Sequence, residues 1–147
     1  MPYTSTHKRQ TRKKIIQSAS KLFSQKGFDQ VSINDLMTDA GLTRGAFYNH
    51  FNDKSSLYSE AIIYAALKSP LRESFRGRES DDSLQALLDG YLSQGHVRQE
   101  STPCPLAFLV TDVSHRNPQV RSTYTQVYRN MIKLLTRLNF EKALPSR

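Results

Sequence analysis

The chain is poor in cysteine and lacks tryptophan: it contains a single cysteine, Cys104. A single thiol cannot form a disulfide within the chain, which excludes the disulfide-stabilised scaffolds of small secreted domains and fits a reducing compartment. Long apolar runs are also missing, since the longest, residues 61–67, has seven residues, whereas a membrane-spanning helix needs about 20. The first 14 residues are polar and do not form a secretory signal. We therefore expect a cytoplasmic protein without a membrane partner.

Acidic residues are scarce, and none precedes Asp29. The chain holds 21 Lys and Arg against 13 Asp and Glu, a formal net charge of +8. Seven basic residues lie in the acid-free stretch: Lys8, Arg9, Arg12, Lys13, Lys14, Lys21 and Lys26. Charge of one sign gathered in this way favours nucleic acid or an anionic surface as the partner. For part of it, a solvated helix face is the alternative.

Period-two alternation is absent, and apolar residues recur at three- and four-residue steps instead, so we expect an all-α fold. A first helix is predicted over residues 9–26, closed by Gly27, with residues 1–7 as a flexible arm. Asp53 caps a predicted helix that ends before Pro70, and residues 69–83 form a linker. Later helices are expected from about Ser83, from Pro105, and from an Asn117–Pro118 start to about residue 138 or 140.

Residues 32–54 predict two short helices joined by a tight turn. Ser32 and Asp35 form an approximate capping box for the first helix, and Gly41 ends it. Thr43 is the expected N-cap of the second helix, which would run for about nine residues, or roughly 13 Å. The predicted core of the three N-terminal helices is Ile16, Ala19, Phe23, Phe28, Ile33, Leu36, Ala40, Leu42, Phe47 and Phe51.

The stretch TRGAFYNHFNDKSSL, preceded by VSINDLMTDAGL, resembles the DNA-binding region of TetR-type repressors, and the match of residue types extends from about Arg12 to Leu57. The resemblance implies a three-helix helix-turn-helix head at residues 1–52 and a helical ligand-binding and dimerisation domain at residues 53–147. It also implies a homodimer bound to double-stranded operator DNA. Two further long helices usually follow in this family, so we expect a C-terminally truncated regulatory domain.

The N-terminal end of the second helix is the expected contact with base edges. Arg44 can fork onto a guanine, Gly45 allows close backbone approach, and Thr43 can contact a phosphate or a thymine methyl group. The resemblance implies phosphate contacts for Tyr48 and Lys54. The remaining candidate DNA contacts are Ser32, Asn49 and His50. For Tyr48 the alternative is a core aromatic, for Arg44 a solvated charge, and for His50 a packing histidine.

Cys104 opens the segment CPLAFLVTDVSHRNPQVRSTY, which resembles the sixth and seventh helices of family members that carry a Gly-Cys pair there, with Pro103 in place of the glycine. A thiol at a helix N-terminus is biased towards thiolate, so Cys104 is a candidate sensor of electrophiles; the alternative is a small buried residue. Tyr91, Tyr124 and Tyr128 could line a ligand pocket or simply pack as core.

No enzyme activity, metal site or cofactor is expected. Cys104 with His96 or His115 lacks an oxyanion loop, and no His/Cys spacing suits a metal. The predicted function is a sequence-specific transcriptional regulator, most simply a repressor released by a small-molecule or thiol-reactive inducer. The alternative is a truncated family member that acts as a helical interaction or ligand-binding protein with weak non-specific DNA affinity.

Overall fold

The computed structural model describes residues 4–69, 72, 82–98 and 104–143. The elements in chain order are α1 Ser5–Lys26, α2 Ile33–Asp39, η1 Arg44–Asn49, α3 Lys54–Leu67, α5 Asp82–Tyr91, α6 Gln94–Val97, α7 Pro105–Phe108, α8 Val110–Ser114 and α9 Pro118–Ala143. The described ranges contain no strand, which confirms the all-α prediction. None of the helices in these ranges is long and apolar enough to span a bilayer.

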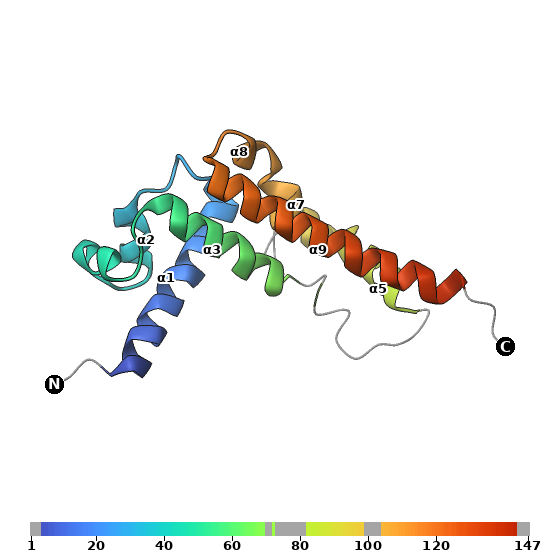
Figure 1. Cartoon of the computed structure of the whole chain (residues 1–147), viewed down its shortest axis with the longest axis horizontal. Helices are drawn as coiled ribbons and strands as arrows, with labels where there is room; N and C mark the ends of the chain where they lie inside the picture. Colours follow the sequence, from blue (N-terminus) through green and yellow to red (C-terminus); the bar gives the residue numbers. More distant parts are fainter. Residues whose placement is uncertain (1–3, 70–71, 73–81, 99–103, 144–147) are drawn as a thin grey trace.

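Two groups of helices share α3 (Figure 1). The N-terminal helices α1 and α2 and the short element η1 gather at one end, and α1 packs against both α2 and α3. From there α3 runs beside the long α9, and α7 contacts both of them. The fold therefore connects its N-terminal part to its C-terminal part mainly through one helix, α3.

The first helix begins earlier than predicted. The Thr4 hydroxyl accepts a hydrogen bond from the backbone N–H of His7 at 3.4 Å, and the helix starts at Ser5. The expectation of a flexible arm was therefore wrong for residues 5–7, because a threonine N-cap is available five residues upstream of the predicted start. The other end agrees with the prediction: Gly27 has φ 76° and its N–H donates to the Phe23 carbonyl at 2.8 Å.

Both ends of α2 confirm the predicted punctuation. The Asp35 N–H donates to the Ser32 hydroxyl at 3.0 Å while the Ser32 N–H donates to the Asp35 carboxylate at 2.9 Å, which completes the capping box. At the other end Gly41 has φ 71°, and the N–H groups of Gly41 and Leu42 donate to the carbonyls of Thr38 and Met37. This is a Schellman motif, and glycine suits its left-handed position.

The second helix of the pair is shorter and tighter than predicted. It is a six-residue 3₁₀ helix, Arg44–Asn49, so the expected length of about nine residues in α-helix was wrong. Thr43 takes the N-cap position, but its side chain makes no capping hydrogen bond. At the far end Asp53 already caps α3, accepting from the Ser56 N–H at 2.7 Å, as predicted. The element ends at its C-cap His50, whose N–H donates to the Phe47 carbonyl at 2.9 Å, three residues before the cap of α3.

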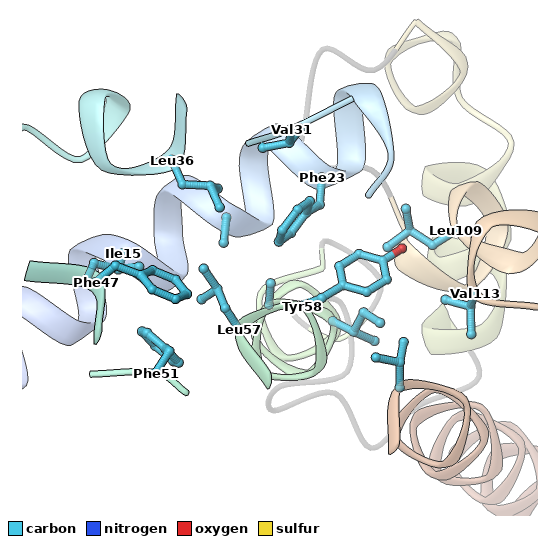
Figure 2. Close-up of a cluster of buried hydrophobic side chains, with 14 of the residues drawn as sticks. Ile15, Phe23, Val31, Leu36, Phe47, Phe51, Leu57, Tyr58, Leu109 and Val113 are labelled. Carbon is cyan, nitrogen blue, oxygen red and sulfur yellow. The ribbon is translucent and has the colours of Figure 1, made fainter. Parts of the chain in front are cut away.

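One hydrophobic cluster runs through both groups of helices (Figure 2). Five of the predicted core residues are buried in it: Ala19, Phe23, Leu36, Phe47 and Phe51. Ile15, one position before the predicted Ile16, is the fully buried residue of that turn, and Ile16 is only partly buried. Phe28, Ile33, Leu42 and Ala40 are also partly buried. Tyr58 lies at the centre, with its ring centroid 4.8 Å from that of Phe23.

The C-terminal helices follow the predicted starts. Pro105 opens α7, which breaks at Leu109 before α8. The Asn117 side chain accepts from the Val120 N–H at 3.0 Å and caps α9, which continues beyond the predicted end to Ala143. The predicted features at Pro70 and Pro103 and most of the predicted linker, residues 73–81 included, lie outside the described residues.

Candidate DNA-binding site

The element η1 separates two neighbouring aromatic side chains. Phe47 is 0% exposed and packs in the core, whereas Tyr48 is 59% exposed. Their rings pack edge to face with centroids 5.1 Å apart, so Tyr48 packs against the buried Phe47. Arg44 and Asn49 are exposed on the same element. Arg44, Tyr48 and Asn49 are thus all exposed on η1.

Arg44 and Gly45 stand at the open N-terminal end of η1. In the part of the chain that the structure describes, no carboxylate pairs with Arg44, and the side chain is exposed. A Cβ at Gly45 would meet nothing within 4 Å, so the fold of the described residues does not require glycine there. Thr43 is exposed and its hydroxyl makes no capping bond. All three are available to an outside partner.

Ser32 and His50 are less available than the residues of η1. The Ser32 hydroxyl is occupied by the capping box, donating to the Asp35 carboxylate at 2.6 Å. The hydrogen bonds from Ser32 lower the pKa of the Asp35 carboxyl. The buried Nδ1 of His50 makes no hydrogen bond to any described residue, and burial lowers the pKa of the imidazole, with Lys8 and Arg12 adding to the effect. A neutral, half-buried His50 resembles a packing histidine more than an anchor for phosphate.

Lys54 lies at the first position of α3, but its side chain does not extend freely. The ammonium sits 4.1 Å from the centroid of the Phe28 ring, and desolvation lowers its pKa. Such a cation–π contact is worth about 0.5–2 kcal/mol depending on exposure. A phosphate contact by Lys54 therefore has to share the ammonium with Phe28 or draw it away.

Some basic residues of α1 form ion pairs within the fold, and others are exposed without one. Arg12 pairs with Glu60 on α3 and stacks over Phe51 at 4.6 Å, and Lys21 pairs with Asp39 at 2.5 Å. The basic side chains of α1 that have no ion-pair partner among the described residues and are exposed are Lys8, Arg9, Lys13, Lys14 and Lys26. These five and Arg44 are exposed cations that a polyanion could bind without breaking an ion pair of the described residues.

A polar network between the N-terminal helices and α8 was not predicted from the sequence. The Arg116 guanidinium donates to both carboxylate oxygens of Asp29, at 2.8 and 2.7 Å, and to Asp112 at 3.3 Å. The hydroxyl of the buried Tyr58 donates to the other Asp112 oxygen at 2.5 Å. The guanidinium also stacks on Phe28 at 4.6 Å. The hydrogen bond from Arg116 lowers the pKa of Asp29, and burial raises that of Tyr58.

Cys104, the candidate sensor, is 4% exposed and precedes a helix of only four residues. Tyr124 is half-buried, and its hydroxyl donates to the Leu106 carbonyl at 2.6 Å, whereas Tyr91 and Tyr128 are more exposed. Across the described ranges no group of three or more His, Cys, Asp or Glu side chains is arranged to hold a metal ion.

Comparison with known proteins agrees with this geometry. Residues 15–61 match the family described as bacterial regulatory proteins, tetR family. The HTH-type transcriptional regulator AcrR of Shigella flexneri is 46% identical over 57 residues, which is 39% of this chain and 26% of that protein. The HTH-type transcriptional repressor BepR of Brucella suis is 28% identical over 112 residues, covering 76% of this chain and 49% of BepR.

Longer matches exist at lower identity. The uncharacterised HTH-type transcriptional regulator YfiR of Bacillus subtilis is 25% identical over 138 residues, covering 92% of this chain and 66% of YfiR. The chain thus spans between a quarter and two thirds of the length of these relatives. The solved structure of the fatty acid degradation regulator FadR from Bacillus halodurans superimposes with a TM-score of 0.60 at 20% identity, covering 89% of this chain and 67% of that one. It shows a shared fold.

Proposed function

We propose that this chain, which carries in residues 15–61 the DNA-binding region of the tetR family of bacterial regulatory proteins, is a sequence-specific DNA-binding transcriptional regulator that acts as a repressor. One observation carries the proposal: η1 buries Phe47 and turns Arg44, Tyr48 and Asn49 outward. Relatives such as BepR are named as repressors, and none of the relatives compared is named as an enzyme.

The outward side chains suit the major groove. The major groove of B-DNA is about 12 Å wide and admits a helical segment with its side chains. In this arrangement Arg44, at the N-terminal end, takes the base edge, and Gly45 lets the backbone come close. Thr43, Tyr48 and Asn49 flank it towards the phosphates. Ser32 and His50 belong to the same proposed surface. The Ser32 hydroxyl is already bonded to Asp35, and the Nδ1 atom of His50 is buried.

The remaining parts of the proposal concern the rest of the chain. Residues 1–52 form the DNA-binding head and residues 53–147 the ligand-binding and dimerisation part, with one hydrophobic cluster continuous across the boundary. Two heads in a homodimer would bind the two halves of a palindromic operator. A small-molecule inducer fits better than a thiol-reactive one, because Cys104 is buried and an electrophile would have to open the fold to reach it.

Arg44→Ala tests the base contact. If Arg44 forks onto a guanine, the variant should lose about 1–3 kcal/mol of operator affinity and relax the preference at one base-pair position. The measurement is a fluorescence-anisotropy titration against an operator and its single-base-pair variants. A loss of the same size on every sequence would show that Arg44 contacts only phosphate.

Lys54→Ala tests a phosphate contact at the start of α3. The slope of log affinity against log salt should become shallower by about one unit. Lys68→Ala is the matched control, because Lys68 is exposed at the other end of the same helix, about 20 Å away. If the salt-dependence slopes of the two variants coincide, the ammonium of Lys54 packs on Phe28 and does not contact a phosphate.

A further inference from the structure

A groove of about 670 Å³ lies between α3 and α9, on a part of the molecule that the proposed DNA contacts do not use. Its volume falls within the range of about 300–1,000 Å³ typical of small-molecule sites. The two helices run side by side there (Figure 1). The apolar lining is Ile63, Ala66 and Leu67 from α3 with Val127, Met131 and Leu134 from α9. Ile63 and Leu67 are 43% and 45% exposed, so apolar surface faces the groove uncovered by any described residue.

The charge of the described lining residues has one sign. Three cationic side chains line the groove, Arg72, Lys133 and Arg137, and none of the described lining residues carries a carboxylate. Within the described ranges none of the three forms an ion pair. The nearest acid on α3 by sequence, Glu60, is already paired with Arg12.

The position of Arg72 is fixed by the end of α3. Its backbone N–H donates to the Ser69 carbonyl at 2.9 Å, and Ser69 is 1% exposed, with its hydroxyl donating to the Ala66 carbonyl at 3.1 Å. Arg72, which follows α3 in the chain, therefore lines the groove together with the two cations of α9. Arginine forks bind carboxylate and phosphate oxygens with two parallel hydrogen bonds.

We propose that this groove binds a single-chain amphipathic anion, with its hydrocarbon chain on the apolar lining and its carboxylate at Arg72, Lys133 and Arg137. The three exposed cations attract an anionic headgroup, do not favour a neutral one and repel a cationic one. The proposal deepens the proposed function, because it names the chemical class of ligand that the C-terminal part would sense. The DNA-binding proposal does not depend on it.

Calorimetric titration of the full chain with dodecanoate, below its critical micelle concentration, tests the groove directly. Dodecanoate should bind more tightly than octanoate by about 10²-fold, since each buried methylene adds about fourfold. Dodecyltrimethylammonium, with the same chain and a cationic headgroup, should bind at least about tenfold more weakly. Equal binding of the anionic and cationic amphiphiles would overturn the proposal, as would binding to anionic lipid vesicles without binding to monomeric dodecanoate.

Charge-neutralising variants locate the site. The triple variant Arg72→Gln/Lys133→Gln/Arg137→Gln should lose at least about tenfold in dodecanoate affinity. The control Arg121→Gln/Arg129→Gln removes two exposed charges from the same helix outside the groove and should bind as the unmodified chain does. Equal affinities of the two variants would overturn the assignment. Thermal melting of both verifies folding.

The two proposals fail separately. Calorimetry without DNA tests the groove alone, and a duplex titration without dodecanoate tests DNA binding alone. If the groove is the inducer site, dodecanoate should weaken binding of the unmodified chain to the operator. Operator binding by the triple variant should change less at the same dodecanoate concentration. Operator binding that dodecanoate leaves unchanged would overturn the sensory role.

Discussion

Phe47→Ala is expected to destabilise the N-terminal helices by about 3–5 kcal/mol, the usual cost of deleting a buried phenylalanine ring. Phe47 is 0% exposed, and its ring centroid lies 5.8 Å from that of Phe51 and 5.1 Å from that of Tyr48. Because the buried ring anchors η1 to the hydrophobic core, its loss should also abolish specific DNA binding. Denaturant unfolding followed by circular dichroism measures the free energy of unfolding.

Tyr48→Ala is the matched control for that variant, one residue along the same element. With 59% of Tyr48 exposed, its removal should change the free energy of unfolding by no more than about 0.5 kcal/mol, while binding to DNA weakens. If Tyr48→Ala destabilised the protein as much as Phe47→Ala, the described orientation of η1 would be wrong, and with it the surface proposed to meet DNA.

Arg116→Ala is expected to lower the free energy of unfolding by about 2–3 kcal/mol. Hydrogen bonds to a charged group contribute about 1.5–3 kcal/mol, and the exposed pair with Asp29 adds little to this. The Arg116 side chain is 14% exposed and that of Asp112 20% exposed, whereas that of Asp29 is 70% exposed. Asp112 would keep only the Tyr58 hydroxyl as a described side-chain partner. Chemical denaturation of the variant and of Arg121→Ala, an exposed arginine early in α9, measures the difference. Equal free energies of unfolding for the two variants would show that the network around Arg116 does not stabilise the fold.

The acid dependence of the same variant follows from Asp29. The hydrogen bond from Arg116 lowers the pKa of Asp29 below its ordinary value of 3.8. A carboxyl with a lowered folded pKa stabilises the fold above pH 3.8, and this contribution disappears as the pH falls through the lowered pKa. The stability difference between the unmodified chain and Arg116→Ala should therefore narrow in strong acid. A difference that widened there would contradict the assigned role of Asp29.

The sequence predicted features that depend on a few neighbouring residues. Ser32 and Asp35 build their capping box within four residues, and Gly27 and Gly41 end helices through their own positive φ angles. Asn117 followed by Pro118 marked the start of α9 for the same reason. These motifs place their hydrogen bonds locally, so the pattern of residue types is sufficient to predict them.

Features that depend on distant residues were missed. Asp29 and Arg116 are 87 positions apart, and nothing in their local sequences pairs them. The choice of Ile15 over Ile16 depends on where α3 packs, since both satisfy a three- or four-residue spacing. The same limit applies to Lys54: resemblance implies a phosphate contact, but only the fold shows that the ammonium rests on Phe28.

The central claim is that η1 presents side chains that distinguish one DNA sequence from another. The most direct test is an anisotropy titration of the full chain against a duplex enriched by selection from a random pool, beside a shuffled duplex of the same composition, over a series of salt concentrations. The proposal predicts binding to the selected duplex that is tighter by about 10³-fold or more, with most of that ratio lost in Arg44→Ala. Equal affinity for both duplexes at every salt concentration would contradict it.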